Sequence, residues 1–327
     1  MIIITGATGF IGSNIVAALN AMGRTDLLLI DDIGETIKWR NIAKRRFTNL
    51  LDYKTFEFGD VPSDTKIEAV LHLGADSSTT VTDGDHILRC NFHASINWWN
   101  WCSANAVPLI YASSAATYGN GENGFKDNED FGYLDSLRPL NLYGWSKHQF
   151  DKWAVENANR GHKPPQWAGL KFFNVFGPNE YHKDSMMSLV AKNTQKIALD
   201  EEVQLFCSHN PNYQDGEQLR DFIYVKECAA IIIWLMANPK ISGLFNVGNG
   251  KAHSFKQLMI MVGKALNKDV NIKYIDMPEE IRPNYQYFTE ASLTKLTKVG
   301  YVPLFSELQA SVSDYVTNYL TQTDKHL

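Results

Sequence analysis

The chain has 327 residues, 44% of them hydrophobic and 20% charged, and a formal net charge of −5. This length suits one large α/β domain and a smaller one, and the negative charge argues against nucleic acid or an anionic membrane as a partner. Four scattered cysteines without a C-x-x-C spacing argue against a zinc site, so we expect no bound metal and a reducing compartment.

Short apolar runs alternate with amphipathic stretches through the first half of the chain. Because the runs are nearly continuous in apolar character, they predict buried parallel strands, at 2–5, 27–30, 69–73, 109–112 and 170–173. A weaker run at 55–58 predicts another strand, third in chain order. Helices are expected between the strands, at 11–22, about 85–104 and 143–159. This alternation predicts an α/β fold with a Rossmann-type, doubly wound parallel sheet.

After residue 174 the loops lengthen and become richer in Asn, Pro, Gly and charge. Runs at 221–225 and 244–247 predict strands that return to the first sheet, and helices are expected at 254–266 and 305–320. We therefore expect an NAD(P)-binding Rossmann domain from 1–174 plus about 221–250. A smaller, mixed α/β substrate-binding lobe would comprise about 175–220 plus 251–327.

The first expected strand leads into Gly6-x-x-Gly9-x-x-Gly12, which opens a helix. Gly6 permits a tight turn, Gly9 lets the backbone approach a pyrophosphate, and Gly12 permits close packing of helix on strand. The helix N-terminus offers free N–H groups and its positive dipole to the phosphates. A glycine triplet alone is also compatible with a structural turn, but its position at the head of a βαβ unit predicts dinucleotide binding.

Charged residues after the second strand bear on which dinucleotide is bound. Asp31 ends this strand about 20 residues on, where an acid holds a ribose 2′-OH and favours NAD. Lys38 and Arg40, just beyond it, are suited to neutralise the 2′-phosphate of NADP, or are ordinary surface residues. Asp60 is a candidate for the adenine edge, or an ordinary turn aspartate.

Tyr143 and Lys147 form a Tyr-x-x-x-Lys pair on one face of a predicted helix. An ammonium beside a phenol favours the phenolate, so we expect Lys147 to lower the pKa of Tyr143 and make it a proton acceptor near neutrality. Such a pair is frequent by chance on amphipathic helices. Ser114 makes chance less plausible, because it follows a strand at the carboxyl edge of the sheet and is placed to orient a reacting hydroxyl.

With these motifs, the chain resembles the extended short-chain dehydrogenase/reductase superfamily over essentially its whole length. Within that superfamily it is similar to the ADP-L-glycero-D-manno-heptose 6-epimerases, through segments 74–80, 173–186, 220–225 and 285–289. The most specific element is His182-Lys183-x-Ser185-Met186, which general sugar-nucleotide epimerases are not expected to share.

The resemblance implies a substrate and a reaction. ADP-D-glycero-D-manno-heptose would be converted to its L-glycero epimer at C6″ through a transient 6″-keto intermediate, supplying heptose for the lipopolysaccharide inner core. Hydride would leave one face of C6″ and return to the other, so the sugar must turn and its oxygen needs a second proton donor. Lys183 is implied in that role, opposite Tyr143, although from composition alone it would be a surface or phosphate-contacting lysine.

The resemblance also implies which residues contact the ligands. Besides the three glycines, Asp31, Lys38 and Asp60, the implied cofactor contacts are Phe10, Ile11, Asp32, Leu73, Gly74, Ala75, Ser77, Asn91, Tyr143, Lys147, Val175 and Lys183. The implied substrate contacts are Ser77, Ser114, Asn174, Ser185, Lys192, Phe206, Arg220 and Tyr285. Arg220 would pair with the diphosphate, and Tyr285 would close the site. The chain departs from the family pattern after Phe206, where it reads Cys207-Ser208-His209 and continues into a longer loop.

The family is expected to use NADP, with NAD as the alternative, and to form homo-oligomers, often pentamers. We expect a cytoplasmic protein without a membrane partner. A strand beginning at residue 2 leaves no room for a secretory signal, and the longest apolar run, 229–237, falls short of the roughly 20 residues of a membrane span.

Three alternatives stay open. A UDP-hexose 4-epimerase would share Ser114, Tyr143 and Lys147 but give Lys183 no role. A 4,6-dehydratase would carry an Asp-Glu pair after the serine, where this chain has Ala115-Ala116. A non-catalytic dinucleotide-binding regulator would tend to lose the tyrosine or the lysine.

Overall fold

The computed structural model describes residues 1–279, 281–282, 285–305 and 307–327. Its centre is a seven-stranded sheet with the order β10-β6-β5-β4-β1-β2-β3, in which all neighbouring strands are parallel. The strands are β1 (Ile2–Thr5), β2 (Leu27–Asp31), β3 (Asn49–Asp52), β4 (Ala69–His72), β5 (Leu109–Ser114), β6 (Trp167–Phe172) and β10 (Gly243–Val247). This is the predicted doubly wound, Rossmann-type fold.

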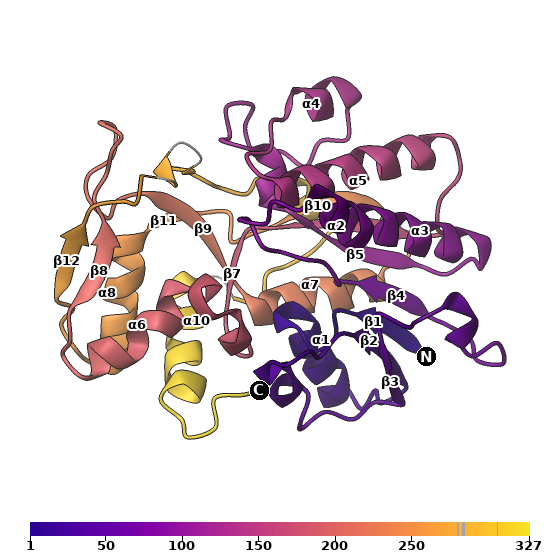
Figure 1. The fold of residues 1–327 in the computed structure, drawn as a ribbon, viewed down its shortest axis with the longest axis horizontal. Coiled ribbons are helices and arrows are strands. Elements are labelled where there is room, and N and C mark those ends of the chain that lie inside the picture. The colour runs from indigo at the N-terminus through magenta and orange to yellow at the C-terminus, as the bar shows by residue number, and fades with distance from the viewer. Residues whose placement is uncertain (280, 283–284, 306) are drawn as a thin grey trace.

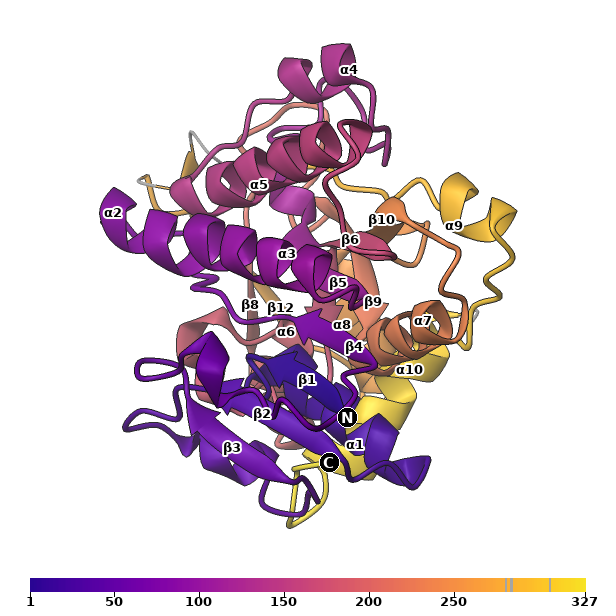
Figure 2. The same ribbon diagram turned by 90° about the vertical axis from the view of Figure 1, so that its right-hand side faces the viewer.

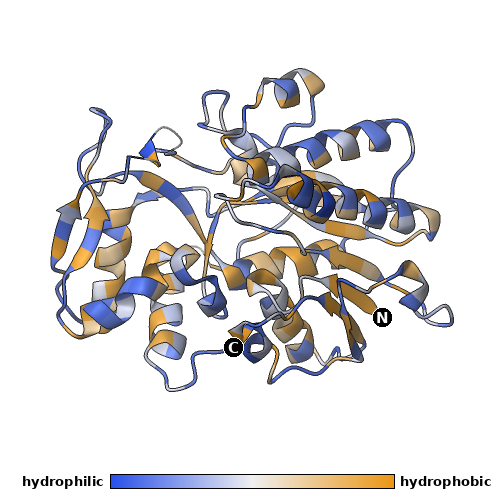
Figure 3. Cartoon of the chain, viewed as in Figure 1, coloured by the Kyte–Doolittle hydropathy of each residue, from blue (hydrophilic) through white to orange (hydrophobic). Residues whose placement is uncertain are grey.

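Helices cover both faces of this sheet (Figures 1 and 2). α1 (Phe10–Ala21) and α7 (Val225–Ala237) pack on one face, and α3 (Ala94–Ala104) and α5 (Leu142–Asn159) on the other. Short helices α2 (Gly84–Ile87), α4 (Phe131–Ser136) and α9 (Thr294–Lys298) lie at the periphery. The expected helix over 85–104 is present, with one π-helical stretch, Leu88–His93, joining α2 to α3. Figure 3 shows the central strands as hydrophobic, because both of their faces are covered.

A smaller lobe lies beside the sheet (Figure 1). It contains a three-stranded sheet, β11-β9-β7, and a two-stranded sheet, β12-β8. Its strands are β7 (Asn174–Phe176), β8 (Val203–Phe206), β9 (Leu219–Tyr224), β11 (Ala252–Ser254) and β12 (Ile272–Ile275), and its helices are α6 (Leu189–Ala198), α8 (Phe255–Leu266) and α10 (Leu308–Tyr315). The lobe has its own hydrophobic core, which includes Val190, Leu258 and Val312. The helix expected over 305–320 begins at Leu308 and ends in a π-helical turn, Val316–Leu320, and residue 306 lies outside the described residues.

The third strand was predicted in the wrong place. It is Asn49–Asp52, and two residues of the run at 55–58, Phe56 and Phe58, pack against α3 instead. The Phe56 ring stacks on Trp98 at 5.5 Å, and the Phe58 ring meets Trp98 edge-on at 4.9 Å. The same contacts bury Trp98, so this part of the aromatic cluster on α3 serves the core.

The prediction that 221–225 returns to the central sheet was also wrong. β9 pairs with β7 and β11 instead, so of the two expected strands only β10 joins the central sheet. Hydrogen bonds explain the position of β9. The buried Asp221 carboxylate accepts the backbone N–H groups of Asn249, Gly250 and Ala291 at 2.6–2.9 Å. A strand carrying a buried carboxylate needs such partners, and the loops of the lobe supply them.

Candidate active site

The turn between β1 and α1 is built to receive a phosphate. Gly6 has a φ of +66°, and a Cβ there would lie 2.7 Å from the backbone nitrogen of Gly74, in the loop after β4. A Cβ on Gly12 would lie 2.1 Å from the Gly6 carbonyl oxygen. The N-cap of α1 is Gly9, whose position has no side-chain cap, so the first N–H groups of the helix face outward. This cradle, a helix N-terminus approached closely by backbone, is suited to an anion such as a pyrophosphate.

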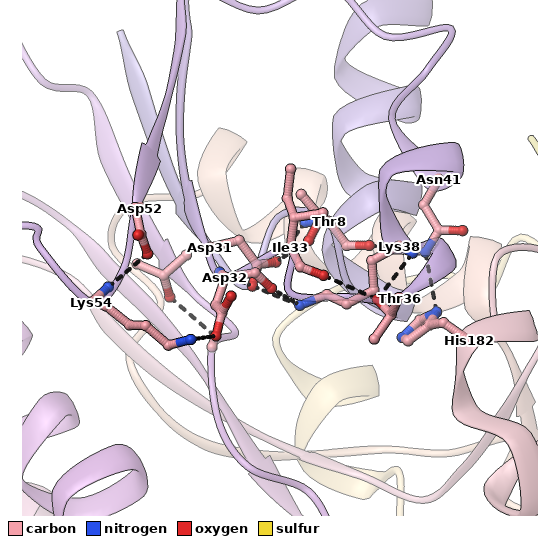
Figure 4. Close-up of polar contacts among 12 residues, drawn as sticks. Thr8, Asp31, Asp32, Ile33, Thr36, Lys38, Asn41, Asp52, Lys54 and His182 are labelled. Carbon is pink, nitrogen blue, oxygen red and sulfur yellow. Dashed lines mark hydrogen bonds and ion pairs between the residues drawn. The ribbon is translucent and has the colours of Figure 1, made fainter.

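Asp31, at the end of β2, is the centre of a polar cluster beside this turn (Figure 4). Its Oδ2 accepts hydrogen bonds from the Thr8 backbone N–H at 2.7 Å and from the Thr8 hydroxyl at 2.6 Å. Its Oδ1 accepts from the Asp32 N–H at 2.7 Å and forms an ion pair with Lys38 at 3.0 Å. Lys38 is therefore held at the end of β2 by Asp31, the acid whose expected preference for NAD it was thought to oppose.

Lys54 is a cation of this region that the sequence analysis missed. It follows β3 by two residues and pairs with Asp32 at 2.7 Å (Figure 4). Lys54 was missed because the third strand was predicted at 55–58. The strand ends at Asp52 instead, so Lys54 lies at the same carboxyl edge of the sheet as Asp31. Asp60, in contrast, accepts the Glu57 backbone N–H at 2.9 Å within a capping box, so its structural role is that of a turn aspartate.

The loop after β4, which carries Leu73, Gly74, Ala75 and Ser77, is fixed from behind. Asn91 is fully buried, accepts the Asp76 N–H and donates to the Asp76 carbonyl, both at 2.9 Å. Asn91 also donates to the Ser146 hydroxyl at 3.1 Å, which links this loop to α5 beside Lys147. Asn91 thus supports the loop from within the structure.

Tyr143 and Lys147 lie one turn apart on α5, and Ser114 lies at the end of β5. Burial raises the pKa of the Tyr143 phenol above its usual 10.0, and a hydrogen bond with Ser114 opposes this rise. Lys147 is 3% exposed, and burial lowers the pKa of its ammonium to about 8. The structure therefore brings the three predicted catalytic residues together.

The expectation that Lys147 lowers the pKa of Tyr143 was wrong for the chain on its own. The phenol loses hydration in the half-buried corner between α5 and β5, and this loss outweighs the favourable interactions of its ionised form. Burial also weakens the hold of Lys147 on its own proton. Deprotonating Tyr143 therefore requires charge beyond that of Lys147.

Lys183 lies where the small lobe meets the glycine turn. It belongs to a 3-10 helix, Tyr181–Met186, and its ammonium is 5.4 Å from the centre of the Phe10 ring at the start of α1. Burial lowers its pKa, and the Glu180 carboxylate opposes this shift. The next residue, Asp184, has φ 45° and ψ −113°, a conformation that is strained for a non-glycine residue.

Glu180 fixes the ends of this segment. Its carboxylate is fully buried and accepts the Gly177 N–H at 3.2 Å, the Ser188 N–H at 2.5 Å and the Ser188 hydroxyl at 2.7 Å. Asn179 donates to the Ser13 hydroxyl on α1 at 3.0 Å. Lys183 is therefore carried by a segment attached to both the lobe and the dinucleotide turn.

Arg220, on β9, is enclosed by aromatic rings. Its guanidinium carbon lies 5.2 Å from the ring centre of Tyr285 and 5.6 Å from that of Phe255 on α8. The ring of Phe206 lies 6.5 Å from that of Tyr285, so three predicted substrate residues meet here. Arg220 is 6% exposed, and its described hydrogen bond goes to the Leu219 carbonyl at 2.9 Å. A buried cation of this kind is suited to a diphosphate.

The remaining predicted contacts lie along the junction between the sheet and the lobe. Asn174 and Val175 are on β7, and Lys192, on α6, donates to the Ser185 carbonyl. Phe10 and Ile11 open α1. Within the described ranges, no group of three His, Cys, Asp or Glu side chains is arranged to hold a metal ion. None of the helices in that part of the chain has the length and apolar character to span a membrane.

Comparison with known proteins gives the family. The family model described as "NAD dependent epimerase/dehydratase family" matches residues 2–248. The chain belongs to this family. Curated relatives named ADP-L-glycero-D-manno-heptose-6-epimerase match over 100% of both chains, at 44% identity for the one from Fusobacterium nucleatum subsp. nucleatum and 43% for the one from Nitratidesulfovibrio vulgaris.

Solved structures of related epimerases share this fold. The Helicobacter pylori ADP-L-glycero-D-manno-heptose-6-epimerase superposes with a TM-score of 0.78 at 25% identity, covering 97% of this chain and 95% of that one. A UDP-N-acetylglucosamine 4-epimerase from Methanobrevibacter ruminantium M1 superposes with a TM-score of 0.77 at 26% identity, covering 96% of both. The resemblance to the extended superfamily is confirmed by this family match and by the shared fold.

Proposed function

We propose that this epimerase inverts C6″ of ADP-D-glycero-D-manno-heptose through a 6″-keto intermediate. The observation that carries the proposal is the full-length likeness, at 43–44% identity, to relatives named for that reaction. Lys183 supports it, since a second acid–base group is what an epimerisation with a turning sugar requires.

The chain's own residues account for the proton movements. A bound oxidised nicotinamide would accept the hydride from C6″ and return it. Ser114 orients the reacting hydroxyl, and Tyr143 takes its proton; the positive charge of the nicotinamide would favour the phenolate where Lys147 alone does not. After the sugar turns about its C5″–C6″ bond, Lys183 donates to the oxygen at its new position.

Substrate binding is assigned to the junction between the sheet and the lobe. Arg220 pairs with the diphosphate, Tyr285 covers it, and Phe206 packs beside the adenosine. Asn174, Ser185, Ser77 and Lys192 contact the sugar side. The proposal divides the chain into a dinucleotide domain and a substrate lobe, with β9 now assigned to the lobe.

We assign NADP as the preferred cofactor. Lys38 and Lys54 lie on either side of the Asp31–Asp32 pair, 3.0 Å and 2.7 Å from its carboxylates. A 2′-phosphate would pair with both ammonium groups and so offset the nearby acids. A homo-oligomer, a cytoplasmic location and a role in lipopolysaccharide heptose supply belong to the same proposal.

The test is incubation of the purified protein with ADP-D-glycero-D-manno-heptose, followed by NMR of the C6″ configuration. The proposal predicts a mixture of both epimers and no turnover of UDP-glucose in a parallel sample. Lys183→Ala should abolish epimerisation, because the turned oxygen loses its acid. Interconversion of UDP-glucose and UDP-galactose, with full activity in Lys183→Ala, would instead establish the UDP-hexose 4-epimerase alternative.

A further inference from the structure

A buried ion pair lies directly beneath the catalytic end of α5. Lys171, on β6, and Asp151, on α5, are both fully buried. The Lys171 ammonium donates to Asp151 Oδ2 at 2.6 Å and to the Thr117 hydroxyl at 2.8 Å. The Asp151 carboxylate also accepts the Ser113 hydroxyl at 2.7 Å and the Tyr111 hydroxyl at 3.0 Å, both from β5.

The pair connects the elements that carry the three predicted catalytic groups. Asp151 follows Lys147 by four residues and Tyr143 by eight, so all three project from one side of α5. Ser113 immediately precedes Ser114. One carboxylate therefore joins the helix of the tyrosine and lysine to the strand of the serine, and Lys171 joins both to β6.

We propose that Asp151 and Lys171 are positioning residues of the epimerase, which hold Tyr143, Lys147 and Ser114 in register and fix the charge that the first two experience. This inference rests on the proposed function, because it assigns a task within that reaction. A contribution to stability alone explains the pair poorly, since replacing a buried ion pair with neutral residues is often neutral or stabilising.

The charge of Asp151 acts on both catalytic side chains. It opposes the burial-driven fall in the pKa of Lys147 and adds to the rise in the pKa of Tyr143. Lys171 lies 2.6 Å from this carboxylate and offsets it. With the pair intact, neither Lys147 nor Tyr143 experiences an uncompensated charge from Asp151 or Lys171.

Other titratable groups lie close enough to the pair to interact with its charges. They are Tyr111 on β5, Tyr118 and Asp127 in the segment after β5, and His148 on α5. Further charges act on these groups or on Lys147, namely His72, Glu129, Asp135 and Lys152. All of them are retained in the Asp151 and Lys171 variants, so differences among those variants report on Asp151 and Lys171.

The experiment measures kcat/KM against pH for Asp151→Asn, Lys171→Met and the double variant. The acid limb of this profile reports the essential base of the free enzyme, here Tyr143. Removing the anion should move the limb to lower pH, and removing the cation should move it to higher pH, each by about one pH unit. The double variant should lie close to the wild type, because both charges are gone.

Lys152→Met is the matched control. Lys152 is the next residue on α5 but pairs with Asp135 at 2.5 Å near the surface, where solvent screens its charge. Its profile should match that of the wild type. Cofactor affinity in the Asp151 and Lys171 variants should stay within about threefold, which separates repositioning of the catalytic groups from loss of the fold.

Shifts in the same direction for the two single variants, or no shift, would overturn the inference. If Lys171→Met does not fold, the comparison of Asp151→Asn with the double variant still tests the inference. Adding Lys171→Met to Asp151→Asn must move the acid limb of kcat/KM back to higher pH. A wild-type protein that leaves ADP-heptose unchanged would refute the proposed function instead, so the two failures are distinguishable.

Discussion

Burial between α5 and β5 favours the neutral form of the Tyr143 phenol, and the interaction with Ser114 opposes this effect. The proposed function therefore needs additional positive charge, which a bound oxidised nicotinamide would supply, to form the phenolate. The pKa of Lys147 is lowered to about 8, which is close to neutral pH. Added positive charge at the site would therefore also favour loss of the Lys147 proton.

Removing the phenol oxygen tests this role. Tyr143→Phe should reduce kcat by about 10²–10⁴-fold, the usual contribution of a general base. The cofactor dissociation constant should stay unchanged, because the glycine turn and Asp31 are untouched. Steady-state kinetics and a fluorescence titration measure the two quantities, and near wild-type turnover would show that another group takes the proton.

Lys54 offers a test of cofactor preference. Lys54→Met should weaken NADP binding about tenfold and leave NAD binding unchanged, because only NADP carries the 2′-phosphate. The difference should shrink at high salt, since Lys54 is exposed. Lys240→Met, an exposed lysine in the loop before β10 and therefore at the opposite edge of the sheet, is the control. Equal weakening of both dinucleotides would contradict the assignment.

At the scale of elements, the close approach of β1, α1 and the loop after β4 determines whether the cradle forms. Gly12→Ala would place a methyl group 2.1 Å from a carbonyl oxygen of the same turn, so the backbone must move. We expect a loss of about 1–3 kcal/mol of unfolding free energy and at least tenfold weaker dinucleotide binding. Thermal unfolding and titration measure these changes.

Gly84→Ala is the matched control for this substitution. Gly84 begins α2, and a Cβ there would meet no atom within 4 Å. Its unfolding free energy should change by less than about 0.5 kcal/mol. Equal effects of the two substitutions would mean that the contact at Gly12 is not what keeps α1 close to β1.

Much of the large sheet could be predicted from the sequence. β1, β2, β4, β5 and β6 are apolar on both faces, and that pattern has no competing explanation at their length. β3 was missed because an edge strand is half exposed and its apolar pattern is weak. The run at 55–58 was chosen instead, because it contains two phenylalanines, and these pack on α3. β9 was assigned to the wrong sheet because apolar character shows that a strand is buried but not which strands are its neighbours.

The proximity of candidate site residues could be predicted where they lie close in sequence or belong to a known motif. Tyr143, Lys147 and the glycine turn are of this kind. Lys54 and the Lys171–Asp151 pair were missed, because their significance depends on which strand ends and helix faces meet in space. The pKa of Tyr143 was predicted in the wrong direction for a related reason, since burial cannot be judged from a four-residue spacing.

At the scale of the whole molecule, the chain should become less stable in mild acid. His72 is 3% exposed and is hydrogen-bonded to Thr5 at 2.8 Å and Ser95 at 3.1 Å, and burial lowers its pKa to about 3. Above pH 6.5 the histidine is neutral in both folded and unfolded chains, so its contribution to the free energy of unfolding is fully present there. As pH falls from about 6.5 toward 3, the unfolded chain binds a proton that the folded chain excludes, and stability is lost.

Denaturant unfolding at several pH values measures this effect. The unfolding free energy should fall by about 1.4 kcal/mol per pH unit below pH 6.5 from this group alone. His72→Gln should lower stability at pH 7.5 but reduce the slope between pH 6.5 and 5. An unchanged slope in the variant would show that His72 is not the group responsible.

The most direct test of the account follows an isotope at C6″. ADP-D-glycero-D-manno-heptose carrying deuterium at that carbon is incubated with the protein in ordinary water until both epimers are present, and the label is measured by NMR. Removal and return of hydride within one closed site predicts that the L-glycero product keeps its deuterium at C6″. Replacement of the deuterium by solvent hydrogen would contradict the account, because it would show that C6″ is inverted by proton exchange.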